Sequence, residues 1–212
     1  MAEIYGRISE VLISGNIEEV QRLTRQALDE GVGPGEVLQK GLLPGMEVVG
    51  QRFKACEMFI PEVLRSAKTM HAAMEILRPL LSEADAAGLG TVVIGTVEGD
   101  LHDIGKNLVA MMLEGAGFTV VDLGTDVKPD RFVEAVKEHR PAILGMSALL
   151  TTTMPKMGET VNALREAGIR DRIKVMAGGA PVTQEFVEQM GGDAYGSNAT
   201  AAVEKAKMLM GR

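Results

Sequence analysis

The residues best suited to chemistry are a carboxylate, an imidazole and a glycine at the spacing Asp-x-His-x-x-Gly, formed by Asp100, His102 and Gly105. A neutral imidazole is a good ligand for a transition metal. A carboxylate two residues earlier can accept the other ring N–H, which fixes the tautomer and raises the basicity of the ligand. Gly105 leaves room for a planar group or a backbone to come close. By itself the pattern fits a metal-ligand histidine and, about equally well, a histidine that only caps the loop.

These residues lie between a predicted strand and a predicted helix. The β-branched apolar run 91–97 is typical of a buried strand, and the apolar periodicity of 104–113 predicts a helix. Open α/β sheets place their ligands at such strand–turn–helix junctions. The nearest P-loop match, 99–107, has one residue too many before its Gly-Lys pair and lacks the Ser or Thr that binds magnesium. The glycines at the junction do not fit a dinucleotide fingerprint either, so nucleotide phosphate binding is not supported.

The composition of the whole chain restricts its class. Its 212 residues suffice for two small domains, and 46% hydrophobic residues predict a packed core. The net charge of −7 and the lack of a Lys/Arg cluster argue against nucleic acid as a partner. No apolar run approaches the about 18 residues of a membrane span, and the N-terminus has no signal pattern. The single cysteine, Cys56, excludes an internal disulfide. We therefore expect a cytoplasmic protein with no membrane partner.

The first part of the chain, residues 1–86, is predicted to be a bundle of four or five helices. Asn16 and Glu19 form a start close to a capping box, 33–35 is predicted as a turn, and Pro44 and Pro61 are placed at helix starts. The predicted helices cover residues 2–14, 16–31, 37–43, 44–53 and 61–81. The small, flexible segment 85–90 places the domain boundary between residues 86 and 87.

The second part, residues 87–212, is predicted to be an α/β domain because strands and helices alternate along it. Strands are predicted at 91–97, 119–123, 142–147, 174–177 and 194–195, and helices at 104–115, 129–139, 154–167, 184–190 and 200–210. Five such units predict a five-stranded parallel sheet with helices on both faces, a doubly wound, flavodoxin-like fold.

Small and hydroxyl-bearing residues follow two further strands of this predicted sheet. The third strand leads into 147–153, Ser-Ala-Leu-Leu-Thr-Thr-Thr, and the fourth into 177–181, Ala-Gly-Gly-Ala-Pro. With Gly105, these segments would line a slot that admits a bulky ligand tail between sheet and helices. We expect a large residue at Gly105 or Gly178 to block this slot without destroying the fold. Ordinary Gly-rich turns are the alternative.

Together these motifs resemble a known family. They are similar to the cobalamin-binding subunits of corrinoid-dependent methyltransferase systems, and to the matching region of cobalamin-dependent methionine synthase. The marks of the family are a D-x-H-x-x-G loop, an S-x-L turn and a G-G turn. They are present here, in the expected order, as 100–105, Ser147-Ala-Leu149 and Gly178-Gly179. The resemblance continues in the helical part through 53–67, and so spans nearly the whole chain.

The resemblance implies a site for cobalamin bound base-off. His102 would replace the cofactor's own dimethylbenzimidazole as lower cobalt ligand, Asp100 would hold its N–H, and Thr153, where the methionine synthase pattern has Ser, would extend the relay. Phe53 and Ile60 would cover the methyl face, with a place in the bundle core as the alternative. The cofactor-binding residues implied in full are Phe53, Ile60, Gly99, Asp100, His102, Asp103, Ile104, Gly105, Ser147, Leu149, Thr151, Gly178, Gly179 and Ala180.

The reaction that the resemblance implies is methyl transfer. Cobalamin alternating between Co(I) and methyl-Co(III) would accept a methyl group from a donor-specific methyltransferase and pass it to an acceptor methyltransferase, with a reductive activase as a further partner. We expect a carrier subunit that does not turn over alone, and donor selectivity in the separate donor methyltransferase.

Three alternatives to the carrier are weaker. A subunit of an adenosylcobalamin mutase would lack the helical cap. A cobalamin sensor would need a DNA-binding module, for which this acidic chain has no spare length. A receiver-like signalling domain with Asp100 as acceptor would leave His102 and the Gly-Gly turn without purpose.

Overall fold

The computed structural model describes residues 2–81 and 89–211. Two compact units make up the chain: Met1–Gly88 with Glu114–Gly117, and Leu89–Leu113 with Phe118–Arg212. The expected domain boundary between residues 86 and 87 lies outside the described residues. In the described ranges, no helix is both long and apolar enough to cross a membrane.

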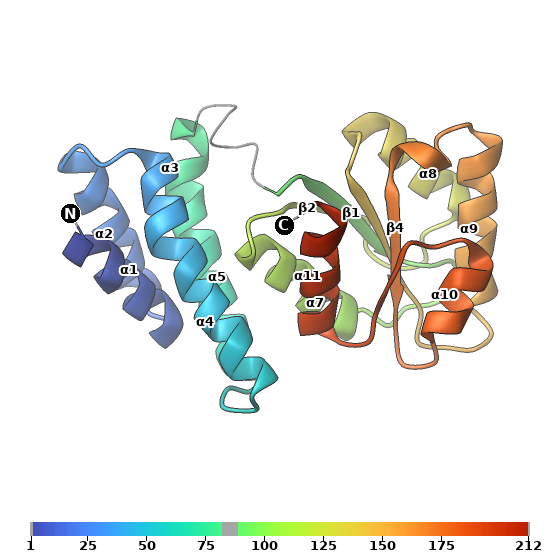
Figure 1. Ribbon diagram of the computed structural model, residues 1–212, viewed down its shortest axis with the longest axis horizontal. Helices are drawn as coiled ribbons and strands as arrows, with labels where there is room; N and C mark the ends of the chain where they lie inside the picture. The colour runs from blue at the N-terminus through green and yellow to red at the C-terminus, as the bar shows by residue number, and fades with distance from the viewer. Residues whose placement is uncertain (1, 82–88, 212) are drawn as a thin grey trace. The chain divides into compact units, whose positions relative to one another are not determined.

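The first unit is a helical bundle, as predicted (Figure 1). The residues that recur at helical spacing form its core: Ile8, Leu12, Leu23, Val63 and Leu77 are all fully buried. Helix α1 contacts α2 and α4, and α5 contacts α2 and α4. The helices are α1 (Ala2–Ser14), α2 (Ile17–Asp29), α3 (Pro34–Glu36), α4 (Leu43–Lys54) and α5 (Ile60–Leu77), with a π-helix at Val37–Leu42 and a 3₁₀-helix at Arg78–Leu80.

The prediction of a turn at 33–35 was wrong, because Pro34 and Gly35 are helical. The predicted third and fourth helices correspond to the π-helix and to α4, with Pro44 in the first turn of α4, but the two follow one another without a break. The helical run starts at Pro34 and continues to Lys54 through the π-helix. Pro44 lies inside this run, and because it has no N–H it cannot donate the helical bond to the carbonyl four residues earlier. The chain accommodates it with a wider turn, in which the Leu43 N–H donates to the Leu38 carbonyl. A proline that is typical of a helix start is therefore accepted within a continuous helical segment.

Side-chain caps fix two other helix starts of this unit. The Asn16 side chain accepts a hydrogen bond from the Glu19 N–H (3.1 Å), which confirms the predicted start of α2. At the start of α5, the Glu62 carboxylate accepts a hydrogen bond from the Phe59 N–H (2.9 Å), and Pro61 lies in the first turn as predicted. Local sequence therefore determines where both helices begin.

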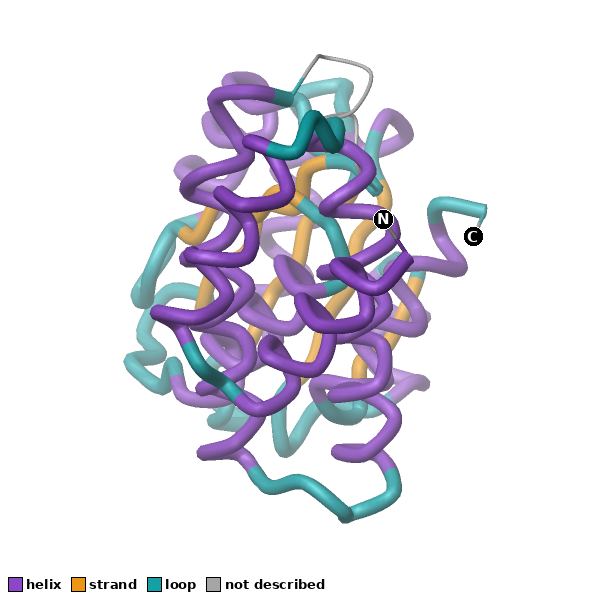
Figure 2. Tube along the Cα trace, turned by 90° about the vertical axis from the view of Figure 1, so that its left-hand side faces the viewer, coloured by secondary structure: helices purple, strands orange, loops and turns teal. Residues whose placement is uncertain are grey.

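The second unit is a five-stranded parallel sheet, as predicted, and its strand order is β2-β1-β3-β4-β5. Figure 2 shows the strands of this sheet in orange, lying side by side. Strand bounds differ from the predicted ones by a residue at most. The strands are β1 (Thr91–Thr96), β2 (Thr119–Asp122), β3 (Ile143–Ser147), β4 (Lys174–Gly178) and β5 (Ala194–Gly196); the helices are α7 (Ile104–Gly115), α8 (Pro129–His139), α9 (Pro155–Glu166), α10 (Gln184–Met190) and α11 (Ala199–Leu209).

Helices cover both faces of this sheet, α7 and α11 on one and α8, α9 and α10 on the other (Figure 1). The central strands are therefore nearly continuously apolar, with β1 buried from Val92 onwards. Phe132 of α8 is fully buried over Gly95, where an added Cβ would lie 2.9 Å from its ring. The closely packed core therefore supports the loops at the carboxyl edge of the sheet.

The strand order reverses between β1 and β3, which are hydrogen-bonded neighbours. The connections from these two strands leave in opposite directions, and ligands of doubly wound folds bind in the crevice that results. Register aligns four strand ends in one row: Thr96 lies opposite Ser147, Ser147 opposite Gly178, and Gly178 opposite Gly196. The fold thus brings the loops that follow β1 and β3 to the same place.

Candidate functional site

The loop after β1 turns sharply so that Asp100 points into the molecule. The Asp100 N–H donates to the Val97 carbonyl (3.1 Å), and Gly99 between them has φ of +79°. A glycine is favoured at this position because a type II turn requires positive φ there. The loop is also tied to the strand, since the buried Thr96 hydroxyl donates to the His102 carbonyl (3.0 Å).

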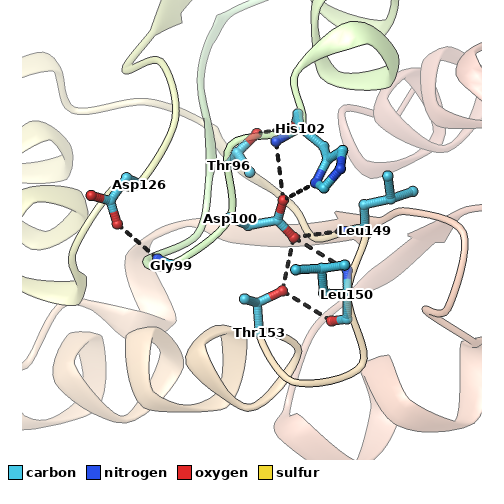
Figure 3. A network of polar contacts seen from close by, with 8 residues as sticks. All are labelled: Thr96, Gly99, Asp100, His102, Asp126, Leu149, Leu150 and Thr153. Carbon is cyan, nitrogen blue, oxygen red and sulfur yellow. Dashed lines mark hydrogen bonds and ion pairs between the residues drawn. The ribbon is translucent and has the colours of Figure 1, made fainter.

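Asp100 is fully buried and its carboxylate is saturated with hydrogen bonds (Figure 3). Oδ1 accepts from the His102 N–H (3.1 Å) and lies 2.8 Å from His102 Nδ1. Oδ2 accepts from the backbone N–H groups of Leu149 (2.8 Å) and Leu150 (3.3 Å) and from the Thr153 hydroxyl (2.8 Å). Burial by itself would raise the pKa of Asp100, but the hydrogen bonds from Leu149, His102 and Thr153 together hold that pKa well below its usual range.

An ionised Asp100 determines which ring nitrogen of His102 carries a proton. A carboxylate can only accept, so Nδ1 must be protonated and Nε2 of the neutral ring keeps a lone pair. The His102 side chain is 52% exposed, whereas the Asp100 side chain is 0% exposed. No residue in the described ranges is hydrogen-bonded to His102 Nε2. The pair therefore presents an oriented, accessible imidazole nitrogen at the carboxyl edge of the sheet.

Large apolar side chains are exposed on the two loops that meet at Asp100. Leu101 and Ile104 beside His102 are 72% and 80% exposed, and Leu149 and Leu150 are 43% and 41% exposed. Grouped exposed apolar residues mark ligand or partner sites. A half-exposed imidazole and four exposed apolar side chains therefore lie on the two loops that meet at Asp100.

The glycines of the expected tail slot differ from one another. Nothing lies within 4 Å of a Cβ placed on Gly105, so this position is open. A Cβ on Gly178 would lie 2.7 Å from the Gly196 carbonyl oxygen, and one on Gly179 only 1.8 Å from that of Ala148. The expectation that Gly178 tolerates a large residue in the unliganded fold was therefore wrong, because packing between strands already requires a glycine there.

The remaining predicted residues are distributed over both units. Asp103 precedes α7 and accepts from Asn107 through its carbonyl (2.7 Å) and its carboxylate (3.0 Å). Ser147 is half-buried at the end of β3, while Thr151 and Ala180 are exposed in the turns after β3 and β4. Two residues lie in the helical unit: Phe53 is half-buried on α4, and Ile60, the first residue of α5, is 45% exposed.

Sequence reasoning missed several residues that shape the site. Thr96 and Gly196 occupy the row of aligned strand ends, and their place at strand termini was the available signal. Lys106 is buried and paired with Asp122 of β2, with its Nζ also 2.6 Å from Asn107 Oδ1. Asp126, which contacts Gly99, had no signal of its own because it is distant in sequence.

Comparison with known proteins assigns the family. A family profile described as "B12 binding domain" matches residues 90–204, and a second profile with the same description matches residues 4–78. The chain is 43% identical over 210 residues to "Trimethylamine corrinoid protein 1" of Methanosarcina acetivorans, covering 98% of this chain and 97% of that protein. The chain belongs to the corrinoid proteins of methyltransferase systems. Its cofactor is accordingly cobalamin.

Other corrinoid proteins agree in sequence and fold. The "Dimethylamine corrinoid protein" of Methanosarcina barkeri is 43% identical over 209 residues, with 98% of each chain covered. A chain in the crystal structure of the methanol:cobalamin methyltransferase complex MtaBC from Methanosarcina barkeri is 34% identical with a TM-score of 0.90, covering 99% of this chain and 80% of that one. A cobalamin-binding protein from Desulfitobacterium hafniense is 33% identical with a TM-score of 0.77, covering 97% and 98%.

Proposed function

We propose that this corrinoid protein is a methyl carrier that binds cobalamin base-off, with His102 Nε2 as the lower ligand of cobalt. The observation that carries the proposal is the half-exposed His102 ring whose Nδ1 is held by a buried, ionised Asp100. A ligand histidine needs a neutral ring, a fixed tautomer and an accessible second nitrogen, and this pair meets all three needs. When bound, the cobalt of cobalamin supplies the atom that takes up and releases the methyl group.

The roles of Asp100, His102 and Thr153 follow from where protons can reside. Asp100 holds the proton on His102 Nδ1 without taking it, because its own pKa is held low. The Thr153 hydroxyl, 2.8 Å from Asp100 Oδ2, supports the carboxylate from the other side. The three residues would thereby adjust how strongly the imidazole binds.

The remaining residues would receive the rest of the cofactor. Gly105 is open and stands at the first turn of α7, so the displaced nucleotide tail would pass there, beside Ser147, Leu149, Gly178 and Gly179. Exposed apolar side chains such as Ile104 would lie against the corrin ring. The other lining residues we propose are Gly99, Asp103, Thr151 and Ala180, with Phe53 and Ile60 of the helical unit as the cover of the methyl face.

We propose three kinds of protein partner: a donor methyltransferase, an acceptor methyltransferase and a reductive activase. Relatives named for trimethylamine and dimethylamine, and a similar chain from a methanol complex, support a small methylated donor such as an amine or alcohol. In this proposal the chain binds the cofactor and shields its methyl group, while the partner proteins act on the donor and the acceptor. The holoprotein alone should therefore not sustain turnover from a simple donor.

The test is electron paramagnetic resonance of the Co(II) holoprotein prepared with ¹⁵N-labelled histidine. Coordination by His102 would change the nitrogen splitting relative to unlabelled protein, because the coupled nucleus has a different spin. His102→Ala should abolish this response, and His139→Ala in α8 is the matched control that should retain it. If the nitrogen splitting is the same with and without the ¹⁵N label, the coordinating nitrogen belongs to benzimidazole, and the proposal that His102 is the ligand would be overturned.

A further inference from the structure

The loop from β2 to α8 runs beside the end of β1 and continues its ladder. The Thr96 N–H donates to the Gly124 carbonyl (2.9 Å), and the Val127 N–H donates to the Thr96 carbonyl (3.0 Å). Val127 also forms a parallel bridge with Val97. This pairing sets Asp126, which lies between the paired residues 124 and 127, beside the turn that carries Asp100.

Asp126 forms hydrogen bonds to the main chain of that turn on both sides of Asp100 (Figure 3). Its carboxylate Oδ1 accepts a hydrogen bond from the Gly99 N–H (2.7 Å), and its own N–H donates to the Asp100 carbonyl (3.0 Å). Asp126 has φ of +54°, a left-handed conformation that Asp tolerates better than most residues because its short polar side chain bonds locally. Asp126 therefore fixes the peptide group between Glu98 and Gly99 and the one between Asp100 and Leu101, which lie on either side of Asp100.

The contacts of Asp126 differ from those made by the loop after β3. Leu149, Leu150 and Thr153 bind the Asp100 carboxylate, whereas Asp126 binds only the main chain around it. The carboxylate can meet its partners after β3 and the His102 ring together only if the main chain holds its direction. Asp126 supplies that constraint from a third loop.

We propose that Asp126 is a positioning residue that acts through Gly99 and Asp100 to aim His102 Nε2 at the cobalt. The proposal rests on the proposed function, in which His102 is the lower ligand. The Asp126 side chain touches neither His102 nor the open position at Gly105, so its effect must pass through the turn. As an exposed residue it should contribute little to folding, which separates positioning from stability.

Two substitutions separate the carboxylate of Asp126 from its backbone conformation. Asp126→Gly keeps the left-handed conformation but removes the acceptor for the Gly99 N–H. Asp126→Asn keeps both the acceptor oxygen and tolerance of that conformation. Asp130→Ala is the matched control, since it removes an exposed carboxylate from the start of α8 without any contact to the turn.

We expect Asp126→Gly to speed hydrogen exchange at the Gly99 amide of the apoprotein about tenfold, as one lost hydrogen bond to a charged acceptor would. The same variant should bind hydroxocobalamin about tenfold more weakly, in line with the loss of other outer partners of metal ligands. At equal cofactor occupancy, a smaller fraction of its Co(II) signal should respond to ¹⁵N-histidine. Asp126→Asn and Asp130→Ala should stay within about threefold of wild type in all three measurements.

Two results would overturn the inference alone. One is wild-type affinity and an undiminished histidine-nitrogen signal in Asp126→Gly while the wild type coordinates through histidine. The other is an equal loss in Asp126→Asn, since that side chain retains the acceptor. A wild-type protein that coordinates benzimidazole would instead overturn the proposed function, and this inference with it.

Discussion

Two loops of the molecule present exposed apolar side chains, but they are held in different ways. The loop after β1 is fixed by Leu149, Leu150 and Thr153, which contact Asp100 across 49, 50 and 53 residues of sequence. The loop between α4 and α5 is held by near neighbours, with the Glu57 and Met58 N–H groups donating to the Arg52 carbonyl (2.8 and 3.2 Å).

The side chains of the two loops differ accordingly. In the β1 loop a buried carboxylate orients a half-exposed imidazole. In the loop between α4 and α5, Phe59 is 65% exposed, Met58 is buried and Cys56 has φ of +58°, while Ile60, the first residue of α5, is 45% exposed. Metal ligation needs one fixed direction, while an apolar cover needs only surface. Long-range polar contacts hold the loop for which we propose metal ligation, and short-range backbone contacts hold the loop beside the proposed apolar cover, as these two proposed roles would require.

Removing the carboxylate at the centre of the β1 loop should lower both the stability of the fold and the affinity for cobalamin. Asp100→Asn places an amide NH₂ against one set of donors, so two buried N–H groups or the His102 ring lose their acceptor. We expect the free energy of unfolding of the apoprotein to fall by about 2–3 kcal/mol, measured by urea unfolding. Cobalamin affinity should fall by at least about tenfold. Wild-type stability in this variant would remove the contrast between the two loops.

The stability that Asp100 contributes should depend on pH in a defined direction. Its folded-state pKa is lowered below the unfolded value of about 3.9, so the contribution is fully present above that pH. It is lost as the pH falls from there towards the folded-state pKa. The difference in unfolding free energy between wild type and Asp100→Asn should therefore be constant near neutrality and shrink below about pH 4.

Replacing glycines near the β1 loop by leucine should distinguish a glycine that leaves room for the ligand from a glycine that the packing of the protein itself requires. Gly178→Leu should destabilise the α/β unit by more than the about 1–3 kcal/mol typical of overpacking, because its Cβ would meet backbone. Gly105→Leu should keep the fold, as shown by unchanged thermal unfolding, but weaken cobalamin binding by about tenfold. If Gly105→Leu binds cobalamin as tightly as wild type, the nucleotide tail does not pass beside Gly105.

Shortening the apolar side chains at the end of α4 and the start of α5 should test whether they cover the methyl face. Ile60→Ala should leave the free energy of unfolding within about 0.5 kcal/mol, because this side chain is largely exposed. Phe53→Ala, at a half-buried position, should destabilise somewhat more. If these residues cover the methyl face, both variants should bind cobalamin as wild type does but lose the methyl group faster on illumination. If the variants and the wild type lose the methyl group at equal rates, at equal cofactor occupancy, Phe53 and Ile60 serve only the packing of the bundle.

A further difference between the two units is how completely each satisfies the hydrogen bonds of its buried polar groups. The Asp100 carboxylate is saturated, whereas the buried Thr24 hydroxyl of the bundle has no hydrogen-bond partner in the described part of the chain. Thr24→Val should therefore stabilise the bundle by about 0.5–1 kcal/mol. Thr69→Val is the matched control: its hydroxyl donates to the Arg65 carbonyl (2.9 Å), and its loss should destabilise by about 1 kcal/mol. If thermal unfolding shows that both substitutions stabilise the protein, or that both destabilise it, this prediction is contradicted.

The sequence by itself determined the elements and the chemical core of the site. Helix starts at Asn16 and Pro61, the α/β alternation and the Asp100–His102 spacing all depend on residues within a few positions of one another. Helix periodicity, helix capping and strand burial depend on residues close together in the chain, so they can be predicted from a single sequence.

The tertiary structure alone decided which distant residues complete that core. The Thr153 and Asp126 contacts to the β1 loop depend on strand order, and the row from Thr96 to Gly196 depends on register, which the hydrophobic pattern of strands buried on both faces does not specify. The helical run through Pro44 depended on whether the chain could widen one turn. The physical reason is the same in each case: local patterns fix elements, but contacts between loops far apart in sequence exist only once the sheet has placed them.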